Sequence, residues 1–99
     1  MFSILLAAGL EGLRKGWEPP EPVQENVFTM SEEERVKRGI TQLPTDFHEA
    51  LRLTRESALV RQALGPHVFE SVLANKRIEW ERYRSAVTDY DLKTYLPIL

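Results

Sequence analysis

The chain has 99 residues, no cysteine, and 13 basic against 15 acidic side chains, for a formal net charge of -2. This length is typical of one small domain. The lack of cysteine excludes a disulfide scaffold and any thiolate metal site, and it is common in cytoplasmic proteins. The balanced charge argues against nucleic-acid binding, which needs a concentrated basic face.

The first ten residues, MFSILLAAGL, are almost entirely apolar. They predict a helix from about Phe2 to Lys15, with Gly16 as its C-terminal stop. A signal peptide is the weaker alternative, because its positive charge precedes the apolar core, whereas here Arg14 and Lys15 follow it. The run is also shorter than the roughly 20 residues that span a bilayer, so no membrane partner is expected. We expect residues 1–16 to form a helix buried on most of its surface.

Residues 17–30 are predicted to form a loop, because Pro19, Pro20 and Pro22 favour extended backbone. The loop is acidic at first and then carries an apolar cluster. This cluster consists of Val27, Phe28 and Met30. We expect the cluster to pin the loop onto the helices.

Short helices are predicted over residues 31–64. Ser31 with Glu34 has the pattern of a capping box, in which each residue bonds the other's backbone amide. This helix is expected to end near Gly39. Thr45 is the expected N-cap of the next helix, and the segment SALVRQAL predicts another.

A long helix is predicted over residues 65–87, because Gly65 ends the preceding helix and Pro66 suits the first turn of the next. One face of it carries a stripe with alternating four- and three-residue spacing. The stripe is formed by Phe69, Leu73, Lys76, Trp80, Tyr83 and Val87. Thr88 then caps a short helical tail over residues 88–99. No segment alternates with period two, so the sequence predicts an all-α chain of five or six helices.

No residue pattern indicates a self-contained active site. His48 and His67 lack a second ligand at metal-binding spacing, and Ser57 and Ser71 lack a neighbouring base. No glycine-rich phosphate loop is present, and the runs of glutamate are typical of solvated helix starts. We therefore predict no catalytic, metal-binding or cofactor-binding residue.

An aromatic and basic surface on the long helix is the weaker alternative. Trp80 and Tyr83 lie near Arg77 and Arg84, a combination that can bind single-stranded nucleic acid. Their helical spacing favours core packing, so we expect no nucleic-acid partner.

Several segments together resemble the C-terminal part of the catalytic domain of type I glutamine synthetases. They include AAGLEG, the loop segment NVF, LP before a helix, ALGPH and KRIEWERY, in this order. The resemblance covers essentially all 99 residues. It implies that the all-α chain is the helical part of a larger α+β catalytic domain.

Members of this family are glutamate–ammonia ligases. They make glutamine from glutamate, ammonia and ATP through γ-glutamyl phosphate, with Mg²⁺ or Mn²⁺ aligning the phosphates. The resemblance places the metal ligands, the ATP-contacting segments and the substrate-binding arginines upstream of the matching part. It therefore assigns no catalytic, metal or cofactor residue to this chain, which is not expected to catalyse the reaction alone.

The resemblance does imply roles for two other segments. Asn26, Val27 and Phe28 match a loop at the rim of the active site, which in some bacterial members carries an adenylylated tyrosine. Phe28 takes that position and has no hydroxyl to modify. The tail matches a helical end that reaches into the opposing ring of a dodecamer. Its residues are Tyr95, Leu96, Pro97, Ile98 and Leu99.

Two interpretations remain open. The chain is either a structural and oligomerising segment of a synthetase, present as a fragment or a truncated copy, or a separate helical interaction module derived from one. In the first case its partners are the rest of the subunit and the neighbouring subunits. The first helix would then pack on the active-site sheet, and the isolated chain would self-associate through that face and through Leu96–Leu99.

Overall fold

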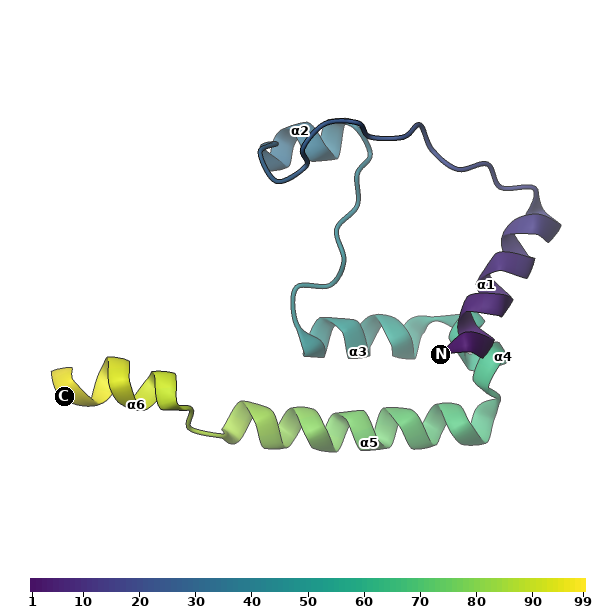
Figure 1. Cartoon of the computed structure of the whole chain (residues 1–99). Coiled ribbons are helices and arrows are strands. Elements are labelled where there is room, and N and C mark those ends of the chain that lie inside the picture. The colour runs from purple at the N-terminus through teal and green to yellow at the C-terminus, as the bar shows by residue number, and fades with distance from the viewer.

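A computed structural model describes all 99 residues of the chain. It contains six α-helices, a terminal 3₁₀ turn and no strand, which confirms the predicted all-α class. The elements are α1 (Phe2–Lys15), α2 (Glu32–Lys37), α3 (Phe47–Glu56), α4 (Ala58–Leu64), α5 (Pro66–Ser85), α6 (Asp89–Tyr95) and η1 (Leu96–Ile98) (Figure 1).

Glycine and proline set two of the helix boundaries where the sequence predicts them. Gly16 ends α1 in the left-handed region, with φ of 65°, and its amide bonds the carbonyls of the last turn. Gly65, with φ of 79°, separates α4 from α5, which starts at Pro66. Residues other than glycine rarely adopt such positive φ values, so the local sequence is enough to end both helices.

Two predicted caps differ from the structure. The Ser31 hydroxyl accepts the Glu34 amide at 3.3 Å, but the Glu34 carboxylate accepts no hydrogen bond from the Ser31 amide, so half of the capping box forms. The predicted cap at Thr45 is wrong by one residue. Asp46 caps α3, and its carboxylate accepts the Glu49 amide at 2.8 Å. Both residues can cap, and a carboxylate also interacts favourably with the helix dipole.

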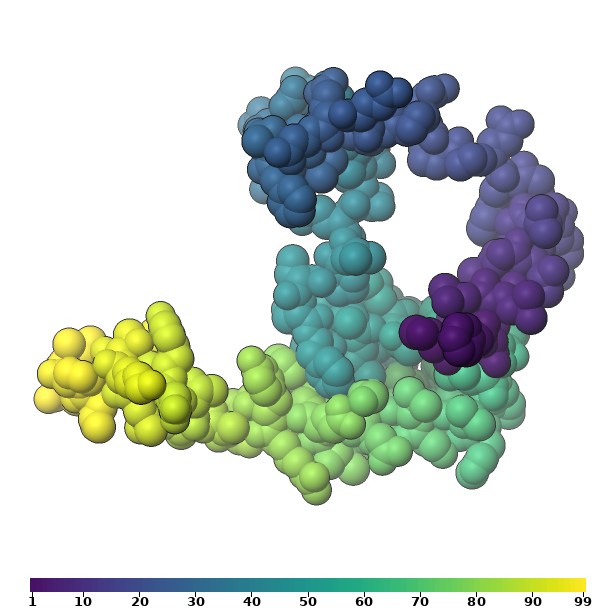
Figure 2. All heavy atoms as spheres, in the orientation of Figure 1, coloured from purple at the N-terminus to yellow at the C-terminus, as the bar shows by residue number.

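The helices form an open arch and not a compact body (Figures 1 and 2). The radius of gyration is 18.8 Å, against about 13 Å for a compact domain of this length. Three residues are buried, namely Met30, Leu51 and Phe69. Figure 2 shows an opening framed by α1, the loop, α2 and α3. No helix is both long and apolar enough to cross a membrane.

The packed centre of the chain is formed by α3, α4 and α5. Figure 1 shows α3 alongside α5, with α4 joining them at one end. Phe69 is fully buried there, and the ring of Trp80 stacks on Phe47 at 6.2 Å between centroids. The predicted stripe is covered only in part, because Tyr83 is exposed. The reason is length: α3 has 10 residues and α5 has 20. Val87 is also exposed and lies outside the helix, since α5 ends at Ser85, two residues before the predicted end.

Residues 1–16 form the predicted helix, but this chain covers only a small part of its apolar surface. α1 has no buried residue, and α4 is the one helix that packs against it appreciably. Ile4 and Ala7 are half-buried, whereas Phe2, Leu6 and Leu13 are exposed. At 100° per residue these three lie on the side of α1 opposite Ile4 and Ala7. The remaining helices lie too far along the arch to cover this side.

Candidate functional site

His48 and Ser57, which the sequence offers as candidates for metal binding and catalysis, take part in packing and helix capping. The His48 ring stacks on Trp80 with centroids 5.4 Å apart. The Ser57 hydroxyl caps α4 by accepting the Val60 amide at 3.3 Å. No group of three or more His, Cys, Asp or Glu side chains could hold a metal ion. The packing of Trp80 agrees with the predicted aromatic core, but Tyr83 remains exposed.

The predicted rim segment forms a tight polar turn. The Asn26 side chain accepts the Phe28 amide at 3.0 Å, and the Asn26 carbonyl accepts the Thr29 hydroxyl at 2.9 Å. This is the usual way in which asparagine stabilises a turn. Val27 is half-buried, and Met30 is buried. Phe28 is 92% exposed, so the expectation that it pins the loop is wrong. The turn instead holds its ring in solvent.

Contacts between the loop and α2 close residues 25–40 into one unit. Glu25 and Arg38 form an ion pair of 3.0 Å across the base of the loop. Hydrogen bonding and the charge of Glu25 raise the pKa of the Arg38 guanidinium above its usual range. Arg35 donates to the Met30 carbonyl at 3.0 Å. Sequence analysis missed these contacts, because opposite charges thirteen positions apart give no periodic signal.

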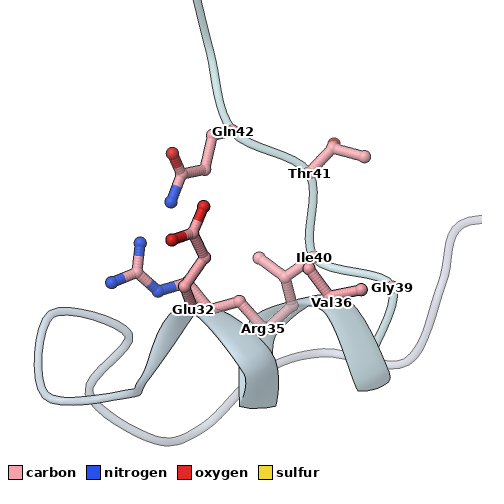
Figure 3. A pocket seen from close by; sticks show the side chains of 7 residues that line it. All are labelled: Glu32, Arg35, Val36, Gly39, Ile40, Thr41 and Gln42. Atoms are coloured by element: carbon pink, nitrogen blue, oxygen red, sulfur yellow. The ribbon is translucent and has the colours of Figure 1, made fainter. Parts of the chain in front are cut away.

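A hollow lies between α2 and the segment that leaves it (Figure 3). Figure 3 shows Glu32, Arg35 and Gln42 grouped on one side and the apolar Val36 and Ile40 on the other. The Nε atom of Arg35 is buried without a hydrogen-bond partner. The hollow is built entirely from residues close in sequence, and α2 makes no appreciable contact with α3–α5.

The Glu25–Arg38 ion pair predicts a measurable effect on loop closure. Glu25→Arg should speed amide hydrogen exchange of Ile40, whose amide donates to the Arg35 carbonyl at 2.9 Å, severalfold, because local opening becomes easier. The double exchange E25R/R38E should restore slow exchange. Unchanged exchange in E25R, or no recovery in the double variant, would show that the pair does not close the loop.

The predicted tail forms α6 and η1, which pack mainly on each other. The rings of Tyr90 and Tyr95 pack edge to face, with their centroids 6.5 Å apart. Leu96, Ile98 and Leu99 are exposed, Leu99 almost completely. All five predicted tail residues are exposed and therefore present surface that nothing in this chain covers. A run of exposed apolar side chains at a chain end is typical of a segment that binds another surface.

The start of α6 is held by a complete capping box. The Asp91 carboxylate accepts both the hydroxyl and the amide of Thr88, at 2.6 and 2.9 Å. The Thr88 hydroxyl in turn accepts the Asp91 amide at 3.2 Å. The hydrogen bonds from Thr88 lower the pKa of Asp91.

This pKa shift predicts how α6 responds to acid. A carboxyl with a lowered folded pKa contributes stability above its unfolded value of about 4 and loses it as the pH falls through the folded pKa. The α6 amides should therefore shift towards coil values below about pH 4 in an NMR titration. Asp91→Ala should fray α6 already at neutral pH and abolish this step. If the step persists in D91A, another group controls the tail.

Comparison with known proteins gives a consistent result. The family described as "Glutamine synthetase, catalytic domain" matches residues 1–95. Glutamine synthetase of Mycolicibacterium smegmatis is 48% identical over 97 residues, which is 98% of this chain and 22% of that protein. Those of Clostridium saccharobutylicum and Methanosarcina mazei are 41% and 42% identical, over 97% and 99% of this chain and 22% of each relative.

The chain thus spans about a fifth of the length of these relatives. The matching family covers nearly every helix described above, from α1 to the end of α6. This chain belongs to the glutamine synthetase family.

Proposed function

We propose that the chain is the helical part of a glutamine synthetase with a structural role, in which it shapes the rim of the active site and joins subunits. The activity it would serve is the ATP-dependent ligation of ammonia to glutamate. The chain alone is not catalytic in this proposal. The observation that carries it is the amount of surface that the chain leaves uncovered.

The exposed area is far larger than that of a self-sufficient domain. The chain exposes 8926 Å², which is about 3,000 Å² more than a compact monomer of 11.5 kDa. Obligate interfaces bury areas of this size. The excess is rich in large apolar side chains on α1 and on the tail. A larger protein that fills the opening of the arch would cover such a surface.

The two predicted segments fit this role in different ways. Residues 25–40 form a closed unit that presents Phe28 on a fixed turn, which suits a loop at the rim of a site. Phe28 has no hydroxyl, so a regulatory nucleotide cannot be attached there. Residues 95–99 extend away from the packed centre (Figure 1), which suits contact with a neighbouring subunit.

The residues of this chain do not fit the metal sites that the reaction needs. Divalent metals that align phosphates are held by carboxylate or imidazole groups. No cluster of three such groups occurs here. The longer protein would therefore supply the ligands of Mg²⁺ or Mn²⁺ and of ATP, and this chain would supply the surface around them.

A complementation experiment tests the proposal. The M. smegmatis synthetase can be expressed without the residues that match this chain, and γ-glutamyl transfer is then measured with each part alone and with both coexpressed. We expect no metal-dependent turnover from either part alone and turnover from the pair. Turnover by the 99-residue chain alone would overturn the proposal.

A matched control separates assembly from nonspecific stabilisation. Coexpression with the L6E/L13E variant, which carries charges on the exposed side of α1, should not restore turnover. Equal restoration by this variant would contradict a role for α1 in assembly. Failure of both forms to bind the truncated synthetase at all would count against the structural role itself.

A further inference from the structure

A basic hollow lies where α3, α4 and α5 meet, at the packed centre of the chain. It has a volume of about 350 Å³, which is within the range of small-ligand sites. Its lining is formed by Arg55, Arg61, Glu70, Leu73, Ala74 and Arg77. Three guanidinium groups thus share the hollow with one carboxylate.

The charges in the hollow do not cancel. Glu70 pairs with Arg61 at 3.5 Å, which leaves Arg55 and Arg77 without an acid in the hollow. Glu56, next to Arg55 in sequence, pairs with Arg52 at 2.9 Å. Glu81, one turn after Arg77, pairs with Arg84 at 3.3 Å. In a chain with more acidic than basic residues, two unpaired guanidiniums therefore face one hollow.

The hollow is positioned by the best-packed residues of the chain. The Arg61 guanidinium lies 4.4 Å from the centroid of the Phe69 ring, and Phe69 is the one fully buried side chain. Such a cation–π contact attracts the guanidinium to the face of the ring. The lining also contains two apolar side chains, the half-buried Leu73 and the exposed Ala74.

We propose that this hollow binds a small anion with at least two negative charges, carried by carboxylate or phosphate groups. Guanidinium groups bind both kinds of oxyanion through paired N–H donors. Arg55 and Arg77 provide the free donors, and Leu73 and Ala74 offer apolar contact to the carbon atoms of a carboxylate ligand. The inference depends on the α3–α4–α5 centre alone and is independent of the proposed function.

An NMR titration tests the site. The arginine Nε–H signals of the ¹⁵N-labelled chain are followed at low ionic strength with inorganic pyrophosphate and, separately, with citrate. Saturable shifts of Arg55 and Arg77 are expected with at least one probe. Pyrophosphate alone would indicate phosphate groups, citrate alone would indicate carboxylates, and both would indicate oxyanions in general.

Matched variants distinguish a site from diffuse positive charge. R55Q/R77Q should weaken binding about tenfold or more, with unchanged circular dichroism because both side chains are exposed. R82Q/R84Q removes the same number of charges from α5 outside the hollow and should change affinity less than about twofold. Equal weakening by R82Q/R84Q, or a response to polyglutamate peptide with none to either small anion, would overturn the proposal.

Discussion

Replacing Phe69 by alanine should unfold the α3–α4–α5 centre. Phe69 is the one fully buried side chain, and the Arg61 guanidinium lies over its ring in a cation–π contact. Removing a buried phenylalanine costs about 3–5 kcal/mol, which is most of the stability of a small domain. Circular dichroism at 222 nm during thermal unfolding should show loss of the cooperative transition and a large loss of helix.

Phe28→Ala is the matched control, because it makes the same chemical change at a solvent-exposed ring. Phe28 is held outward by the Asn26 turn, so its removal should change stability by no more than about 0.5 kcal/mol. Similar losses in both variants would mean that Phe69 does not anchor the centre. A large loss in F28A alone would mean that the loop packs on the helices after all.

Local signals in the sequence predict most helix boundaries. Gly16, Gly65 and Pro66 act through backbone preference, and the hydroxyl of Thr88 acts within its own turn. These effects span at most a few residues, so a single sequence contains them. The error at Asp46 arises because two neighbouring residues can both cap a helix, and their local propensities are similar.

Tertiary contacts are less well predicted from the sequence, because they depend on which helices and loops pack against each other. The α5 stripe is correct as far as Trp80, and it fails at Tyr83 because α3 is too short to continue. The apolar composition of α1 predicts that it needs neighbours, but the sequence cannot show that they are missing from this chain. The same limit applies to the ion pair between Glu25 and Arg38, which depends on how the loop folds back.

For the candidate site, the family resemblance supplied the rim and tail segments, which composition and spacing could not have identified. Residue patterns predict that the chain encodes no catalytic cluster, since such clusters need particular side chains and not only a particular fold, and this stays a prediction. The conformation of the rim could not be derived, because either orientation of Phe28 suits an apolar residue in a loop. The turn at Asn26 decides it.

The exposed side of α1 should drive self-association of the isolated chain. Leu6 and Leu13 are 64% and 80% exposed and lie opposite the side that meets α4. Burying two leucines contributes about 3 kcal/mol or more per chain, which corresponds to more than a hundredfold in the association constant. Light scattering should therefore show oligomers of the native chain and a shift to monomer in L6E/L13E.

The double variant V36E/V87E is the control for this experiment, since it adds the same two charges elsewhere. Val36 and Val87 are 72% and 71% exposed but do not belong to α1. If added charge alone prevented association, this variant would become monomeric as well. If the α1 side is the cause, it should remain oligomeric. A native chain that is strictly monomeric while α1 stays helical would contradict the prediction, because the apolar side of α1 would then be stable in contact with solvent.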